Sequence, residues 1–219
     1  MNAIAVALMF LSAVLPVDDK ADQVLDMLES ASDQLKSFRA EFEQVEIDEF
    51  RDETRISGTW QFLRGGRMRL SVINRNGQVL EESVTDGKTG WQINHNLKKV
   101  DVASVSSVGG RISGYSSINV QNLKNSYTST YLGEVELRSG PAHHLRCKPI
   151  RGAEGADPTV LSIEIWVNVE FPSPIVKIKA TQRGRVVTTI ELYDIQRNVD
   201  VDPGIFKYRV PRGYEEIKH

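Results

Sequence analysis

The residues best suited to chemistry in this 219-residue chain are four histidines and one cysteine, which could in principle build a catalytic or metal site. His143 and His144 are adjacent, and neighbouring residues of a strand point to opposite faces, so the two cannot share one metal ion comfortably. His95 lies in an Asn-His-Asn turn, and His219 is the last residue. We therefore expect no metal site, no cofactor and no catalytic histidine.

Cys147 is the one cysteine, so it cannot form an internal disulfide, and we predict a semi-buried strand residue. The motifs HExxH, GxSxG, the phosphate-binding P-loop and Cys-x-x-Cys do not occur in the sequence. Lysine and arginine number 27 against 29 aspartates and glutamates, a balance that does not suggest a nucleic-acid partner. These observations predict a protein that is not an enzyme.

Short strands separated by glycine-containing turns are predicted for residues 55–100. Apolar and polar side chains alternate before Gly65 and Gly66 reverse the chain, and Asp86-Gly87 is a two-residue turn typical of tight hairpins. We expect one face of this meander to be aromatic and aliphatic. Its apolar residues are Trp60, Phe62, Met68, Leu70 and Trp91.

The elements around this meander complete a mainly β chain of one domain. Apolar residues recur at helical spacing over residues 21–39, which predicts an amphipathic helix that packs on the sheet and leads directly into a first strand. Phe206 and Tyr208 predict a last short strand, followed by a polar tail. Further strands are predicted at residues 131–138, 142–150, 160–169, 175–182 and 186–195.

The segment 103–130 is rich in serine, glycine and asparagine, and a short helix is predicted within residues 118–127. A connection of this kind next to an apolar sheet face could be a lid, or it could be an ordinary surface loop.

Residues 1–15 contain no charged side chain, and the apolar run ends at Pro16. This length is typical of a signal peptide, so we expect residues 1–17 to be a signal peptide and residues 18–219 to form a single domain in the periplasm. An uncleaved anchor and an N-terminal core helix are the alternatives. No cysteine follows the apolar run, so we expect a soluble protein rather than a lipoprotein.

Four short motifs, in this order and spacing, resemble the family of the periplasmic outer-membrane lipoprotein carrier LolA and its receptor relative LolB. The family patterns are F-x-A-x-F-x-Q, G-x-[LF]-x-[LFV]-x-R-P, S-D-G-K-x-x-W and F-x-[FY]-x-x-P-x-G. The matching residues are Phe38, Ala40, Phe42 and Gln44; Gly58, Trp60, Phe62 and Arg64; Asp86, Gly87, Lys88 and Trp91; and Phe206, Tyr208, Pro211 and Gly213.

This resemblance implies an α+β fold, an incompletely closed antiparallel β-barrel covered by the N-terminal amphipathic helix and short lid helices. It also implies an apolar cavity for the acyl chains of a lipoprotein or another lipid. Arg64 would hold the helical lid by hydrogen bonds, and Met68 would face the lid or a partner. Gly65 stands where the family usually has proline, and Met68 where phenylalanine is common.

The function implied by the resemblance is that of a monomeric carrier that ferries lipoproteins between membranes without catalysis. Its partners would be an inner-membrane release machinery and an outer-membrane receptor. The candidate cavity and lid residues are Trp60, Phe62, Arg64, Met68, Leu70 and Trp91. The alternative is an envelope sensor, or another protein-binding or lipid-binding domain, of the same fold.

Overall fold

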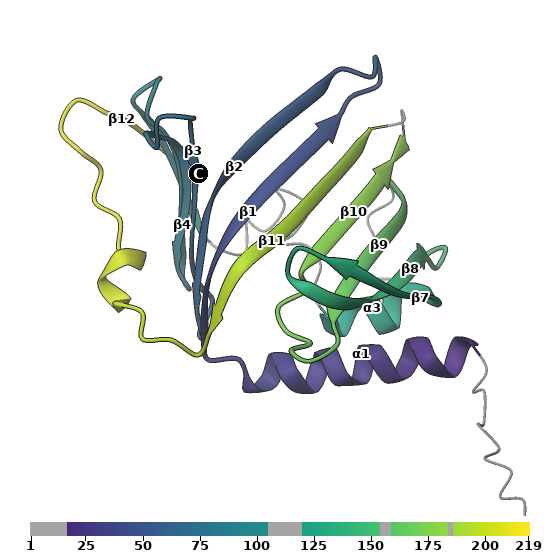
Figure 1. The fold of residues 1–219 in the computed structure, drawn as a ribbon. Coiled ribbons are helices and arrows are strands. Elements are labelled where there is room, and N and C mark those ends of the chain that lie inside the picture. Colours follow the sequence, from purple (N-terminus) through teal and green to yellow (C-terminus); the bar gives the residue numbers. More distant parts are fainter. Residues whose placement is uncertain (1–16, 105–119, 154–158, 184–185) are drawn as a thin grey trace, which may run out of the picture.

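The computed structural model describes residues 17–104, 120–153, 159–183 and 186–219, which form one curved sheet with two α-helices and a 3₁₀ helix (Figure 1). The first half contains α1 (Val17–Gln34), β1 (Ser37–Ile47), β2 (Glu53–Leu63), β3 (Arg67–Ile73), β4 (Val79–Asp86), β5 (Thr89–Asn94) and β6 (Lys99–Ser104). The second half contains α3 (Val120–Ser126), β7 (Tyr127–Leu137), β8 (Gly140–Pro149), β9 (Val160–Asn168), β10 (Lys177–Gln182), β11 (Val187–Arg197), η2 (Pro203–Phe206) and β12 (Glu215–Lys218).

The strand order is β12-β6-β5-β4-β3-β2-β1-β11-β10-β9-β8-β7, so the twelve described strands form a single open sheet whose two edges are β12 and β7. Two meanders of hairpins, β1 to β6 and β7 to β11, are joined where β1 pairs antiparallel with β11. Only β12 breaks the antiparallel pattern among these strands, because it pairs parallel to β6. The expected incompletely closed antiparallel barrel with an N-terminal helix is confirmed.

Helix α1 packs its apolar stripe on the second meander. Ala21, Val24, Leu25 and Leu28 are fully buried, and they pack in one cluster with residues of α3 and strands β7 to β10. The spacing of these residues at three and four positions puts them on one side of the helix. The helix therefore covers one face of the sheet, which we call the inner face.

The register shows which side chains share this inner face. Phe42 of β1 lies opposite Leu192 of β11 and Gly58 of β2, and residues paired in this way point to the same side of an antiparallel sheet. Following the pairs outward places Leu145 of β8 and Val72 of β3 on the inner face as well.

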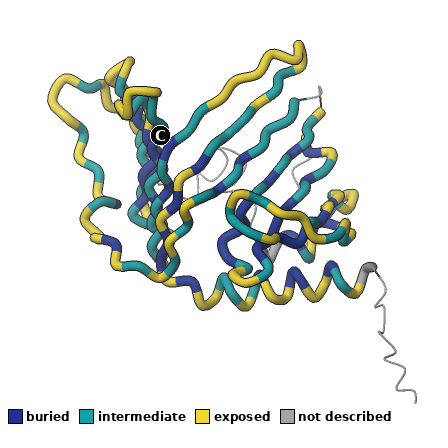
Figure 2. Tube along the Cα trace, viewed as in Figure 1, coloured by how far each residue is buried: buried dark blue, intermediate teal, exposed yellow. Residues whose placement is uncertain are grey.

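The first meander buries its opposite face in strands β4 to β6. Val84, Ile93 and Val100 are buried there, together with Trp91 and Val102. The cover is the C-terminal segment, which contributes Tyr208, Val210 and Tyr214 and runs along the side of β3 to β6 that faces away from β1 and β11 (Figure 1). The buried apolar residues therefore change from one face of the sheet to the other between β3 and β4, and Figure 2 shows buried residues in both places.

One expected element is replaced by another, one strand was not predicted, and two expected segments lie outside the described residues. Phe206 ends a 3₁₀ helix rather than starting a strand, because Pro203 begins that helix and the Asp202 carboxylate accepts from the Gly204 amide at 2.8 Å. The polar tail contains strand β12, which was not predicted from the sequence. The predicted short helix is present as α3, whereas residues 105–119 of the candidate lid and residues 1–16 of the expected signal peptide lie outside the described residues.

None of the helices in the described ranges combines the length and the apolar character needed to cross a membrane.

Candidate functional site

The candidate site is a set of apolar side chains on the inner face of β1 to β3 and β11, together with Leu35 from the connection between α1 and β1, and we call it the inner-face cluster. Its buried members are Leu35, Phe38, Ala40, Phe42, Trp60, Met68 and Leu192, and its half-buried members are Ile56, Phe62, Leu70, Val72 and Ile195. Period-two alternation on adjacent strands brings these residues together. The half-buried members present apolar surface that a ligand could cover.

Aromatic contacts and one glycine determine how this cluster packs. The ring of Phe38 stacks on Phe62 and meets Trp60 edge to face, with a centroid separation of 5.5 Å in both pairs. Phe42 packs over Gly58, where an added Cβ would lie 2.8 Å from the Phe42 ring and 1.8 Å from the carbonyl oxygen of Ser71. Position 58 therefore requires glycine, because any side chain would clash with both the ring and the neighbouring strand.

Arg64 joins the end of β2 to the C-terminus of α1. Its Nε donates to the Leu35 carbonyl at 3.2 Å, and its Nη2 donates to the same oxygen at 3.1 Å and to the carbonyl of Ser32 at 3.4 Å. Nη2 also donates to the carbonyl of Asp33. The last carbonyls of a helix lack partners within the helix and carry partial negative charge, so a guanidinium is well suited to bind them.

The turn after Arg64 shows why the proline of the family pattern is absent. Residues 64–66 connect β2 to β3, and Gly65 and Gly66 have φ values of 95° and 74°, the left-handed region that glycine adopts without strain. Proline is restricted to φ near −65°, so it could not occupy position 65 in this turn. Glycine in place of proline at position 65 therefore gives a different turn, and Arg64 still contacts α1.

Five of the six candidate residues lie in or beside the inner-face cluster, and one does not. Trp60, Phe62, Met68 and Leu70 are members, and Arg64 contacts the helix that ends at this cluster. Trp91 lies on the outer face, where it packs with the C-terminal segment. The expectation that Trp60 and Trp91 share one apolar face of the meander is wrong, because the register of the pairs from β2 to β5 puts Gln92, and not Trp91, on the face of Trp60.

The members that sequence reasoning did not select as site residues include Leu35, Phe38, Phe42 and Leu192. Phe38 and Phe42 alternate with polar residues in β1, and both belong to the family-like motif, so that motif was the available signal. Leu192 joins the cluster through the pairing of β1 with β11, which no local pattern reveals.

His143 and Cys147 are buried on the inner face of β8. His143 is 3% exposed, and its Nδ1 lies 3.2 Å from the Tyr131 hydroxyl and 3.3 Å from Glu134 Oε1. Burial lowers the pKa of His143, an effect that the negative charge of Glu134 opposes. Burial raises the pKa of the Cys147 thiol to about 11, so this cysteine stays protonated and is a poor nucleophile at neutral pH.

His144 points to the other face, as expected from its position next to His143. Its Nε2 lies 2.8 Å from Glu164 Oε2, and its ring stacks on Trp166 at a centroid distance of 4.3 Å. Among the described residues, no group of three or more His, Cys, Asp and Glu side chains could hold a metal ion.

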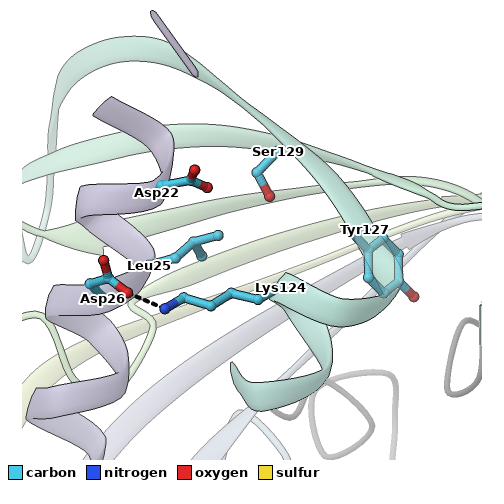
Figure 3. A pocket seen from close by; sticks show the side chains of 6 residues that line it. All are labelled: Asp22, Leu25, Asp26, Lys124, Tyr127 and Ser129. Carbon is cyan, nitrogen blue, oxygen red and sulfur yellow. Dashed lines mark hydrogen bonds and ion pairs between the residues drawn. The ribbon is translucent and has the colours of Figure 1, made fainter. Parts of the chain in front are cut away.

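A polar cavity of about 280 Å³ lies where α1, α3 and β7 meet (Figure 3). Lys124 of α3 crosses it, with Nζ paired to Asp26 and 3.0 Å from Glu29 Oε2. Hydrogen bonds to these two carboxylates raise the pKa of Lys124. The ion pairs attach α3 to α1. The lining residues are Asp22, Leu25, Asp26, Lys124, Tyr127 and Ser129.

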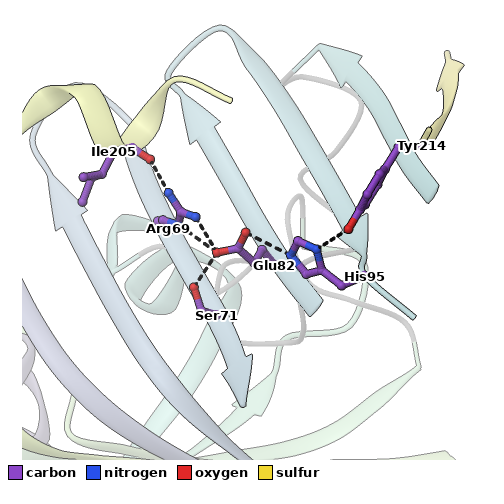
Figure 4. A network of polar contacts seen from close by, with 6 residues as sticks. All are labelled: Arg69, Ser71, Glu82, His95, Ile205 and Tyr214. Atoms are coloured by element: carbon purple, nitrogen blue, oxygen red, sulfur yellow. Dashed lines mark hydrogen bonds and ion pairs between the residues drawn. The ribbon is translucent and has the colours of Figure 1, made fainter. Parts of the chain in front are cut away.

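A buried polar network attaches the C-terminal segment to the outer face (Figure 4). Glu82 is 5% exposed, and its Oε1 accepts from Arg69 Nη2 at 2.7 Å and from the Ser71 hydroxyl at 2.9 Å. His95 bridges Glu82 Oε2, at 3.2 Å, and the Tyr214 hydroxyl, at 2.9 Å. These contacts hold the cover of β4 to β6 in place, which is a structural role.

Comparisons with known proteins find the fold and no closer relationship. No family model matches the sequence, and no curated protein is similar to it. An uncharacterized conserved protein from Thermus thermophilus matches with a TM-score of 0.60 and 14% identity, over 91% of this chain and 99% of that one. MucB matches with a TM-score of 0.55 and 16% identity, over 91% of this chain and 66% of that one.

The lipoprotein LppX of Mycobacterium tuberculosis matches with a TM-score of 0.55 and 12% identity, over 84% of this chain and all of that one. This chain has the fold of MucB and LppX. A LolA superfamily protein from Nitrosomonas europaea also matches, with a TM-score of 0.45 and 11% identity, over 86% of this chain and 97% of that one. The expected architecture, an open antiparallel sheet with an N-terminal helix, is confirmed and is shared with MucB and LppX.

Proposed function

We propose that this protein is a periplasmic carrier that binds the acyl chains of a lipoprotein, or of another acylated molecule, against the inner-face cluster. Binding and release would involve no catalysis. The observation that supports this proposal best is the inner-face cluster itself, in which half-buried apolar side chains such as Leu70 and Val72 continue a buried aromatic core. A charged or small polar ligand would gain little from such a surface, whereas an acyl chain would be removed from water there.

The free energy gained by burying methylene groups favours an acyl chain as the ligand. Burying one methylene group contributes about 0.8 kcal/mol, so a chain of about a dozen methylenes contributes roughly 10 kcal/mol before the costs of association. Such binding needs apolar area and no reactive group, in keeping with the protonated Cys147 and the partnered His143 and His144. Arg64 would keep α1 at the edge of the cluster and act as the latch of a helical lid.

Release requires a change in the protein or a partner, because no chemical step weakens the bound state. By resemblance to the lipoprotein-carrier family, the partners would be an inner-membrane release machinery and an outer-membrane receptor. The similarity in fold to the lipoprotein LppX supports an envelope location.

A matched pair of variants tests the proposal. Val72 on the inner face and Val102 on the outer face are both half-buried strand valines. We expect Val72→Asp to weaken binding of a fluorescent fatty-acyl probe at least about tenfold, since a charge would lie beside the chain. Val102→Asp should leave binding near the wild-type level. Thermal unfolding would verify that both variants fold, and Val72→Thr would serve as a milder replacement.

The proposal fails if the wild-type protein binds no acyl probe in a saturable manner. It also fails if the two aspartate variants bind the probe equally well. Mass spectrometry of the lipids retained by protein purified from its native envelope would identify the natural cargo.

The second candidate function is a protein-binding envelope sensor. MucB, whose fold this chain shares, has been crystallised in complex with MucA of Pseudomonas aeruginosa, a structure that this chain matches with a TM-score of 0.50. Edge strand β7 presents the exposed side chains of Leu132 and Val135, and an open edge can accept a strand from a partner. Purification of a single stable protein partner, with no lipid retained, would favour this candidate over the carrier.

A further inference from the structure

The inner face is not apolar over its whole width. On β4, Ser83 and Thr85 are directly opposite Leu70 and Met68 of β3, so they point to the same side as the inner-face cluster. On β5, Gln92 is directly opposite Ser83. We call Ser83, Thr85 and Gln92 the polar strip.

Two members of the polar strip are buried although they are polar, and the third, Gln92, is half-buried. Ser83 is 7% exposed and Thr85 is 6% exposed. The Ser83 hydroxyl donates to the Gln92 side-chain oxygen at 2.5 Å, and Thr85 Oγ1 accepts from the Gly87 amide at 3.0 Å. These two hydroxyl groups are therefore used within the protein.

Gln92 differs from them, because its side-chain nitrogen is buried and has no hydrogen-bond partner among the described residues. A buried amide donor without an acceptor costs free energy, and folded proteins contain few of them. An unmet donor beside an apolar binding surface is a reason to look for an acceptor that a ligand supplies.

The next strand adds charge on the same side. Asp101 of β6 is opposite Gln92. Lys99 lies two residues before Asp101 on the same strand, and its Nζ is 3.8 Å from Asp101 Oδ1. Along one row of paired residues the inner face thus passes from aromatic and aliphatic groups through a hydroxyl and an amide to a charge; the row is Trp60, Leu70, Ser83, Gln92 and Asp101. In the next row, the exposed Glu81 of β4 is opposite Val72. Adjacent strands are about 4.8 Å apart, so the passage from the apolar rows to Gln92 spans about 10 Å.

This gradient has the polarity of an acylated amphiphile lying across the strands. The chain would lie on β1 to β3, the uncharged linkage on β4 and β5, and the head group near β6. We propose that the polar strip binds the ester or amide carbonyl through which an acyl chain is joined to its head group, with Gln92 Nε2 as the donor. This inference rests on the proposed carrier function and adds a preference for the linkage.

The test compares two fluorescent probes with the same chain length, an ester-linked monoacylglycerol and the ether-linked alkylglycerol that lacks the carbonyl. We expect the wild-type protein to bind the ester about tenfold more tightly, because only the ester carbonyl satisfies the amide donor. Gln92→Met keeps a similar volume and removes both donors, so it should bind the two probes with equal affinity. Gln61→Met, on the outer face of β2, should retain the preference of the wild type.

Each outcome decides the matter. Equal binding of the two probes by the wild type, or a preference that survives in Gln92→Met, overturns the assignment of Gln92 and leaves the carrier function standing. Absence of binding for both probes overturns the carrier function and this inference with it. If Gln92→Met does not fold, Ser83→Ala removes the hydroxyl that orients the amide, and it should reduce the preference for the ester.

Discussion

Removal of the Arg64 side chain should loosen the C-terminal end of α1 more than it disturbs the sheet. Arg64→Ala loses the two donors to the Leu35 carbonyl, at 3.1 and 3.2 Å, and the contacts to Ser32 and Asp33. A hydrogen bond contributes about 0.5–1.5 kcal/mol, and Arg64 is itself exposed to solvent. Counting only the two part-buried bonds to Leu35, we expect a loss of about 1–2 kcal/mol.

Urea unfolding measures the total loss, and hydrogen exchange of the α1 amides locates it. We expect faster exchange in the last two turns of α1, with the strand amides of β1 and β2 unchanged relative to global stability. Arg67→Ala is the matched control, because Arg67 lies three residues away and donates to the carbonyl of Arg64 rather than to the helix. If Arg67→Ala loosens α1 as much as Arg64→Ala, the assignment of Arg64 as the tether of α1 is wrong.

Three further predictions follow from the packing and from the shifted pKa values. Gly58→Ala should destabilise by about 2–3 kcal/mol through overpacking, whereas Gly77→Ala, which has open space and a positive φ, should cost about 1 kcal/mol; chemical denaturation distinguishes them. Cys147 should resist alkylation at pH 8 in the folded protein and react at the ordinary rate after denaturation, as a thiol assay would show. His143 has a lowered pKa in the folded state, so the unfolded state binds more protons below about pH 6.5. Stability should therefore fall as the pH drops from 6.5 towards 5, and His143→Gln should flatten this dependence in unfolding experiments. An unchanged slope in His143→Gln would show that another group is responsible.

The strands and the first helix could be predicted from the sequence because their signals are local. Alternation with period two in β1 to β3 and in β9 needs only a few residues to be visible, and the spacing of Val24, Leu25 and Leu28 indicates a helix in the same way. The family-like motifs added the open sheet and placed Arg64 near a helix.

The face of each strand could not be predicted, because it depends on the register of every hairpin in between. Trp60 and Trp91 look equivalent as aromatic strand residues, yet the pairs that connect β2 to β5 put them on opposite sides. A shift of one position at any of these pairings would reverse the answer. Trp91 is covered by Tyr208 and Tyr214, which lie more than a hundred residues later in the chain, so no local sequence pattern predicts this contact.

The C-terminal elements escaped prediction for a similar reason. Strand β12 has the sequence EEIK, which lacks an apolar stripe, and it is a strand because it pairs with β6. The alternation of Phe206 and Tyr208 was misleading, since the two side chains belong to a 3₁₀ helix and an irregular segment.

The pairing of β1 with β11 has a consequence for how the chain reaches its native state. Every other antiparallel pair in the described sheet joins strands that are consecutive in sequence, so each can form by closing a short loop. The contact of Phe42 with Leu192 requires the two ends of most of the chain to meet, which is the slowest kind of event in folding. We expect the two meanders to form independently and the pairing of β1 with β11 to form late. The inner-face cluster includes residues from both meanders, because Leu192 lies on β11 and Trp60 lies on β2. The binding surface would thus be completed in the last step of folding, and a chain arrested before that step would have two half-surfaces and no site.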